Sequence, residues 1–180
     1  MEDVETKRIV ALAIVAFALI GTSFAVSVVA ADDDEADWVA VLAGKNEVPA
    51  RETRARGVAL FFMNDDGTFD FKLIVANIRN VVAAHIHCGS PTVAGPVGVT
   101  LFSGAAPGGG RFDGILAEGT ATAPDAGNAC GWTDLAQVIT AMNGPDTYVN
   151  VHTNDGVAPI NTGPGDFPGG EIRGQLMVAD

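Results

Sequence analysis

The sequence contains little cysteine and little positive charge, and each shortage excludes a class of protein. Two cysteines in 180 residues are too few for a disulfide-rich scaffold or for a zinc site of four thiolates, so at most one disulfide can form. Only 10 lysines and arginines accompany 22 aspartates and glutamates, which gives a formal net charge of -12. A chain this acidic repels phosphate backbones, so we expect no nucleic-acid partner.

Motifs of the common hydrolases and nucleotide-binding proteins are also missing from the sequence. No serine or threonine forms a recognisable nucleophile motif with a histidine. No glycine-rich loop follows a predicted strand and opens a helix, which is the arrangement that phosphate binding requires. The residues therefore favour a protein that is not an enzyme.

An uncharged apolar run over residues 9–30 is the first strong signal that is present. A basic pair precedes the run and an acidic cluster follows it. Small residues up to Ala30 form a signal-peptidase pattern, which predicts that 1–30 is a signal peptide and that the mature chain starts near Ala31. The run is also long enough to span a bilayer of about 30 Å, so an uncleaved membrane anchor is the alternative. Either outcome places the remainder outside the cytoplasm, whether secreted, periplasmic or at the cell surface.

After an acidic linker over 31–37, the remainder, 38–180, is predicted to be one domain made of short strands and turns. Within 69–75, large apolar residues alternate with polar ones, which is the pattern of a sheet with one buried face. The preceding Asn-Asp-Asp-Gly over 64–67 is typical of a hairpin turn. Strands are expected over 38–42, 57–63, 68–78, 83–87, 97–102, 114–121, 148–153 and 171–178.

This series of strands predicts an all-β fold, either an immunoglobulin-like or Greek-key β-sandwich or a barrel. One short helix interrupts the strands. Its apolar residues fall at helical spacing from Leu135 to Met142, Thr133 or Asp134 can cap its start, and Asn-Gly-Pro over 143–145 ends it. We expect its apolar stripe to cover one end of the barrel.

The chain has three histidines, and all three fall in predicted strands. His85 and His87 are two residues apart, so on a strand both point to the same face, with Cα atoms about 7 Å apart. His152 shares a face with Tyr148 and Asn150, and it can join the pair if the strands are neighbours. Three imidazoles without a thiolate suit copper or zinc and leave a position for water or substrate. We expect the three to converge at one end of the barrel; the alternative is that they are half-buried structural residues.

Cys88 and Cys130 are the only thiols in what is predicted to be an oxidising compartment, so a disulfide between them is expected. This bond would tie the end of the His-x-His strand to the loop before the helix. A thiolate ligand beside His87 is disfavoured, because Cys88 points to the opposite face of a regular strand. Asp155 and Asp166, in a long loop, are weaker candidates for a calcium site.

Four motifs follow one another along the chain. They are GKNEVP over 44–49, AHIHCG over 84–89 with GPV over 95–97, YVNVHT over 148–153 and PGGEIRGQL over 168–176. Together they resemble the CHRD domain, which is named after chordin and also occurs in bacterial and archaeal secreted proteins. The resemblance runs from about Trp38 to Val178. It implies an immunoglobulin-like β-barrel and a non-catalytic binding module of unsettled role, whose partner is an unknown protein or surface component.

A fainter similarity links the histidines to the Cu,Zn superoxide dismutases. That family carries two copper ligands as His-x-His on one strand, which His85 and His87 match, and another on a later strand, which His152 matches. No histidine remains for the metal-bridging ligand, and no zinc cluster follows the pair. The similarity therefore implies a copper or zinc site, and these departures from the family pattern argue against dismutase activity. Glu171 and Arg173 share a strand face and are expected to form a structural ion pair at the sheet surface.

Overall fold

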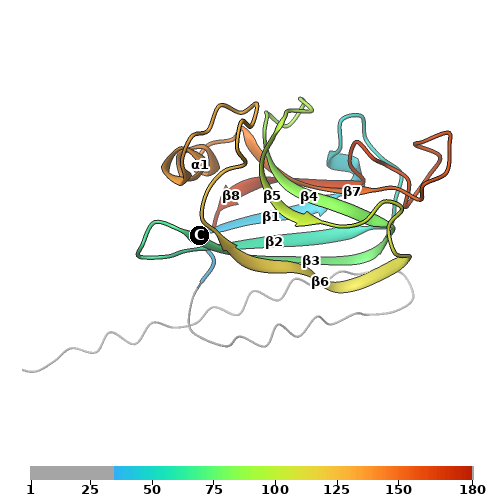
Figure 1. The fold of residues 1–180 in the computed structure, drawn as a ribbon, viewed down its shortest axis with the longest axis horizontal. Helices are drawn as coiled ribbons and strands as arrows, with labels where there is room; N and C mark the ends of the chain where they lie inside the picture. Colours follow the sequence, from blue (N-terminus) through green and yellow to red (C-terminus); the bar gives the residue numbers. More distant parts are fainter. Residues whose placement is uncertain (1–34, 180) are drawn as a thin grey trace, which may run out of the picture. The chain divides into compact units, whose positions relative to one another are not determined.

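The first and last strands of the domain lie side by side in the middle of one sheet. A computed structural model describes residues 35–179 of the protein. The strands are β1 (Trp38–Ala43), β2 (Arg56–Met63), β3 (Phe69–Arg79), β4 (Val81–Cys88), β5 (Val97–Ser103), β6 (Arg111–Ala121), β7 (Thr147–Thr153) and β8 (Ile172–Val178). They form an antiparallel sheet in the order β5-β4-β7-β8-β1-β2-β3-β6, and its edge strands β5 and β6 approach each other (Figure 1). The predicted all-β fold is confirmed, in the form of a nearly closed barrel.

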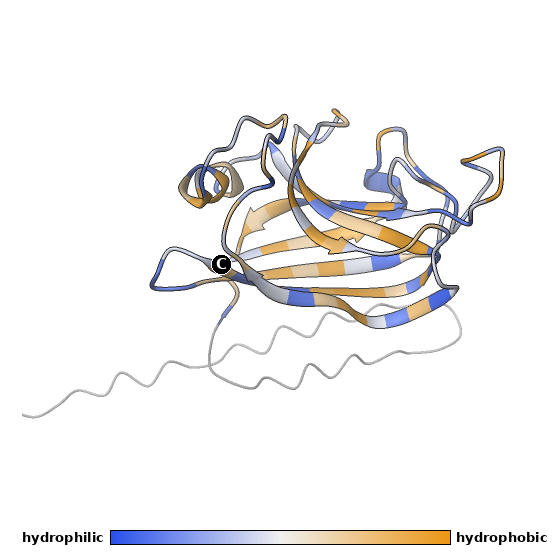
Figure 2. Ribbon diagram, in the orientation of Figure 1, coloured by the Kyte–Doolittle hydropathy of each residue, from blue (hydrophilic) through white to orange (hydrophobic). Residues whose placement is uncertain are grey.

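The hairpin of β2 and β3 illustrates why this sequence forms strands. Gly67 takes a φ of 84° in the turn, a conformation that disfavours residues with a side chain. Hydrophobic and hydrophilic positions are interspersed along the strands (Figure 2). Along β3, Phe69, Leu73 and Val75 are almost fully buried, whereas Asp70 is exposed. Burying each of these large side chains contributes roughly 1.5–3 kcal/mol. The predicted turn and its alternating strand are confirmed.

The helix α1 (Leu135–Met142) lies beside one end of the barrel (Figure 1). Its first turn is capped by Asp134, whose carboxylate accepts a hydrogen bond from the Gln137 backbone N–H at 3.0 Å. The apolar stripe that includes Val138 is buried in the same hydrophobic core as the strands. A short 3-10 helix, η1 (Gly44–Asn46), which the sequence did not predict, turns the chain after β1.

The predicted signal peptide or anchor over 9–30 lies outside the described residues. Within 35–179, no helix is both long enough and apolar enough to cross a membrane.

Candidate metal centre

The pairing of β4 with β7 places His152 beside the His-x-His pair. His85 lies opposite Asn150 in the register of these strands, and His87 lies one pleat further along β4. Ile86, between the two, is fully buried in the core. The alternation of a strand then directs the histidines to the outer face of the barrel wall. The triad therefore lies on the face of the barrel wall that is opposite Ile86.

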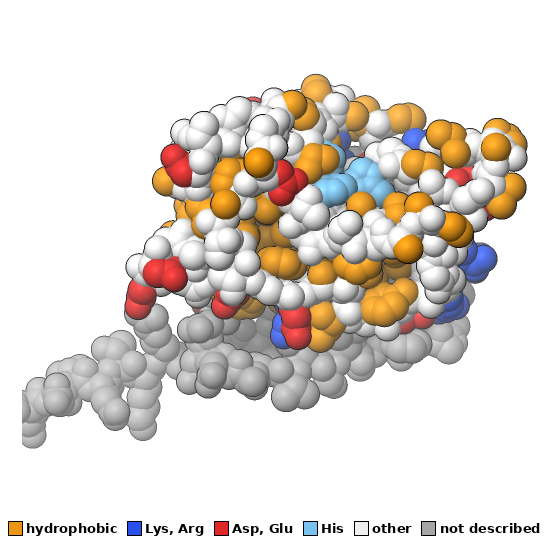
Figure 3. Space-filling view, in the orientation of Figure 1, with side chains coloured by type: hydrophobic (Ala, Val, Ile, Leu, Met, Phe, Trp, Pro, Cys, Tyr) orange, Lys and Arg blue, Asp and Glu red, His pale blue; other side chains and the backbone are white. Residues whose placement is uncertain are grey.

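The three imidazole rings touch one another. Their centroids are 4.9 Å apart for His85 and His152, 5.5 Å for His85 and His87, and 5.6 Å for His87 and His152. One nitrogen from each ring lies within 4.8 Å of the other two. Nitrogens bound to one copper or zinc ion lie about 3–4 Å apart, so small side-chain rotations would bring these into ligating positions. Histidine side chains are visible at the surface in one view (Figure 3), and His85 and His152 are partly exposed, which leaves a route for an ion.

Two of the rings are oriented by backbone carbonyls. His87 Nδ1 lies 2.9 Å from the Gly95 carbonyl oxygen, and His152 Nδ1 lies 2.8 Å from the Pro168 carbonyl oxygen. A carbonyl only accepts, so Nδ1 is the donor and Nε2 of the neutral ring keeps its lone pair. Nε2 of His87, Nε2 of His152 and Nδ1 of His85 are buried and have no hydrogen-bond partner within residues 35–179. Burying an unpaired polar atom is costly, and coordination to a metal ion is one way to satisfy such a nitrogen.

Burial also keeps these imidazoles neutral. It lowers the pKa of His85 and of His87 to about 4, and the mutual repulsion of the protonated rings acts in the same direction. Burial likewise lowers the pKa of His152. All three rings are therefore in the metal-binding protonation state at neutral pH.

Gly95 is the point at which the backbone holds His87. Its carbonyl also accepts a hydrogen bond from the Tyr148 hydroxyl at 3.2 Å, and its N–H donates to that hydroxyl oxygen at 2.9 Å. The Tyr148 ring stacks on the His87 imidazole, with centroids 4.8 Å apart and planes 12° from parallel. A Cβ atom at residue 95 would overlap the Cys88 carbonyl, so only glycine fits there. The 89–96 loop thus fixes both the tautomer and the plane of one candidate ligand.

The predicted disulfide between Cys88 and Cys130 is confirmed, with Cα atoms 5.8 Å apart. Cys88 directly follows His87 at the end of β4, and Cys130 belongs to the segment that leads into α1. The bond therefore restrains the strand that carries two of the three histidines.

The carboxylate of Glu171 anchors the 154–170 loop, which holds His152. Glu171 is fully buried and accepts hydrogen bonds from the Thr153 hydroxyl at 2.7 Å, the Gly165 N–H at 2.7 Å and the Thr53 hydroxyl at 2.6 Å. The predicted ion pair between Glu171 and Arg173 is wrong: no such pair forms within the described residues. Glu171 precedes β8, and its hydroxyl and N–H partners already occupy both carboxylate oxygens.

Arg173 has a position that the sequence did not reveal. Its side chain is 1% exposed and donates to the carbonyl oxygens of Val93 at 2.8 Å and Ser90 at 2.7 Å, and to Gln175 Oε1 at 2.9 Å. Its guanidinium carbon lies 3.4 Å from the centre of the Tyr148 ring.

Glu47 is, after Glu171 and Arg173, a third buried ionisable side chain close to this face. It is 7% exposed, and Asn150 donates a hydrogen bond to its carboxylate at 3.3 Å. Burial raises the pKa of Glu47 to about 7, although the positive charges of Arg173 and Arg51 oppose the shift. The carboxyl is therefore only partly ionised at neutral pH.

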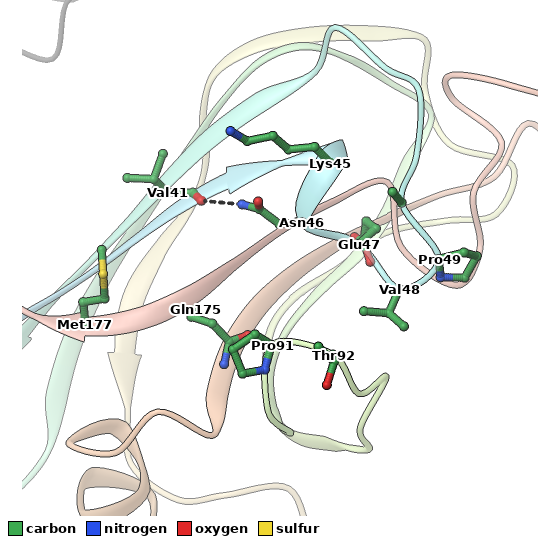
Figure 4. A pocket seen from close by; sticks show the side chains of 11 residues that line it. Val41, Lys45, Asn46, Glu47, Val48, Pro49, Pro91, Thr92, Gln175 and Met177 are labelled. Atoms are coloured by element: carbon green, nitrogen blue, oxygen red, sulfur yellow. Dashed lines mark hydrogen bonds between the residues drawn. The ribbon is translucent and has the colours of Figure 1, made fainter.

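A shallow hollow of about 660 Å³ lies next to Glu47, and none of the histidines lines it (Figure 4). Its apolar lining includes Val41 and Met177, which are partly exposed. The side-chain amide of Asn46, beside them, donates a hydrogen bond to the Val41 carbonyl oxygen at 3.5 Å. The hollow and the histidine triad are separate features.

The weaker calcium candidates do not come together. The Asp155 carboxylate accepts from the Val157 N–H at 2.9 Å, whereas the Asp166 carboxylate accepts from both the N–H and the hydroxyl of Thr162 at 2.9 Å. In the described part of the chain, the histidine triad is the one group of three or more potential ligands that converge.

The barrel and the triad define a small β-domain with a candidate metal centre on its wall. The family model of the CHRD domain matches residues 38–176, which is most of the chain. The protein therefore belongs to the CHRD domain family, as the four motifs indicated. No curated protein matches the chain. The family and the disulfide both fit an extracellular protein.

Proposed function

We propose that this protein is an extracytoplasmic, non-catalytic binding module whose His85, His87 and His152 bind one copper or zinc ion. One observation carries the proposal: the three histidines each offer a ring nitrogen within 4.8 Å of the other two. Each histidine also has one buried ring nitrogen without a hydrogen-bond partner within residues 35–179. Membership of the CHRD family supports a binding module in general.

The chemistry of the donor set fits these metals. Imidazole nitrogens suit copper and zinc, whereas calcium and magnesium prefer oxygen ligands. The carbonyls behind His87 and His152 orient the rings and increase their basicity, as the second shell of a metal site does. Three protein ligands leave a coordination position for water or for a ligand brought by a partner.

The charge of the chain favours metal handling over dismutase chemistry. A net charge of -12 attracts cations to the surface and repels small anions such as superoxide. We therefore propose a module that holds a metal, or presents it to an unknown protein or surface partner, without turning over a substrate.

Metal content and calorimetry test the proposal. The purified protein should retain or take up one copper or zinc ion per chain, with a dissociation constant tighter than about 10 μM at pH 7.5 (about -7 kcal/mol). The H85A/H87A double variant should lose binding. K72A is a matched control, because Lys72 is a partly exposed residue on β3. If the wild-type protein binds neither metal, the triad is a structural cluster and the metal proposal is wrong.

A further inference from the structure

We infer that Arg173 is a selectivity residue that biases the histidine triad toward a singly charged ion, Cu(I), over doubly charged ions such as Zn²⁺. The inference rests on the proposed metal-binding function. It concerns which ion the site prefers, and it assigns Arg173 no contact with the metal.

The geometric basis is a column of three stacked groups. The guanidinium of Arg173 lies 3.4 Å from the centre of the Tyr148 ring, and the other neighbour of that ring is the His87 imidazole at 4.8 Å. The guanidinium carbon therefore lies no further from the centre of the His87 ring than the sum of these two distances. Tyr148 and Arg173 lie on neighbouring strands, β7 and β8, so the sheet fixes this spacing.

The charge of Arg173 is poorly compensated. Arginine stays protonated at physiological pH, and all three hydrogen-bond acceptors of this side chain are neutral oxygens. Within residues 35–179, no carboxylate forms an ion pair with it. Glu47 is the carboxyl whose charge acts on Arg173, and burial raises its pKa to about 7, so its negative charge is incomplete at neutral pH.

The ligands add no negative charge of their own. The triad consists of three neutral imidazoles without a carboxylate or thiolate. Arg173 therefore repels a bound cation, and it repels a doubly charged ion twice as strongly as a singly charged one. An ion bound to a nitrogen of His87 would lie about 3 Å from the centre of that ring, and so at most about 11 Å from the guanidinium. With an effective protein dielectric constant near 20, the extra unit of charge then lowers affinity by roughly tenfold.

The test compares two ions across charge-removing and charge-retaining variants. Affinities for Cu(I), by anaerobic competition with a chromophoric chelator, and for Zn²⁺, by calorimetry, are measured in one buffer for wild type, R173M and R173K. R173M should shift the ratio of affinities toward Zn²⁺ by roughly tenfold, whereas R173K should keep the wild-type ratio. R111M is the control, because Arg111 is an exposed residue paired with Asp113.

A purely structural role gives a different result. Arg173 also holds the 89–96 loop, so its loss can weaken both ions equally, and then the ratio would not move. An unchanged ratio in R173M overturns the inference while the proposed function stands, whereas a wild-type protein that binds neither ion fails the proposed function itself. If the Arg173 variants do not fold, E47Q gives the test: at pH 8 it should shift the ratio several-fold toward Cu(I), and no shift overturns the inference.

Discussion

Replacing Cys88 and Cys130 together by serine should lower the free energy of unfolding by about 4 kcal/mol. The two cysteines are 42 residues apart in the sequence, so the bond removes a large loop from the freedom of the unfolded chain. The chain-entropy relation gives about 4 kcal/mol at 25 °C for a loop of this length. For a domain of this size, that loss corresponds to a fall in melting temperature of roughly 8–16 °C.

Urea titration followed by tryptophan fluorescence measures this difference, since Trp38 is buried in the core and Trp132 packs against it. The wild-type protein, its reduced form and the C88S/C130S variant are compared at one pH. The reduced form and the variant should unfold at the same urea concentration, with the wild-type protein well above both. C88S/C130S should also bind metal more weakly, because its β4 strand is less restrained beside His87.

A difference below about 1 kcal/mol would contradict this reasoning. It would mean that the unfolded chain is already restricted near the two cysteines, or that strain in the folded state cancels the gain. A large loss of stability with unchanged metal affinity would instead show that the loop network alone positions His87.

Four further predictions concern the site and its surroundings. G95A should weaken metal binding, measured by calorimetry, by about 10- to 100-fold, because the carbonyl that orients His87 must move. G119A is the control, because a Cβ atom fits at Gly119. Metal binding should persist below pH 6.5 and be lost only toward pH 4–5 in a pH titration, because burial lowers the pKa of His85 and His87 to about 4; loss already at pH 6.5 would contradict this. The metal-free protein should lose stability as the pH falls from about 6.5 to about 4, because in this interval His85 and His87 bind protons in the unfolded chain but not in the folded one. E47Q should be more stable than wild type at pH 8 by up to about 3 kcal/mol. The pKa of Glu47 is raised to about 7 in the folded state, so the wild-type protein loses stability as the pH rises from 4.5 through 7. Equal stability of the wild-type protein at pH 8 and pH 5 would refute this prediction.

Residue parity was enough to predict that His85 and His87 share a face, whereas the position of His152 beside them depended on its strand being a neighbour. A strand directs every second side chain to the same side, so His85 and His87 had to project together, and Ile86 between them had to point the other way. The family resemblance supported the barrel, and the shortage of cysteines left one partner for Cys88. These features depend on local pattern or on counting, which a single sequence provides.

The surroundings of the triad could not be predicted in the same way. The carbonyls that orient two histidines come from loops whose paths are set by distant contacts, such as the anchoring of the 154–170 loop by Glu171. The alternation that placed Glu171 and Arg173 on one face did not reveal that loops would cover both side chains. Burial of a charge depends on what packs over it, and that packing is a property of the whole fold.

The pairing of β1 with β8 makes the barrel dependent on the last strand of the domain. Trp38 is opposite Val178 in this pairing, so the central seam of the sheet joins residues from opposite ends of the domain. Sheets dominated by such distant pairings close slowly, because most of the chain must be ordered before the seam forms. β8 also carries Arg173, which supports the 89–96 loop. The histidine triad therefore reaches its final form only after the whole domain has emerged and folded, so an ion would enter the finished protein and not a nascent chain.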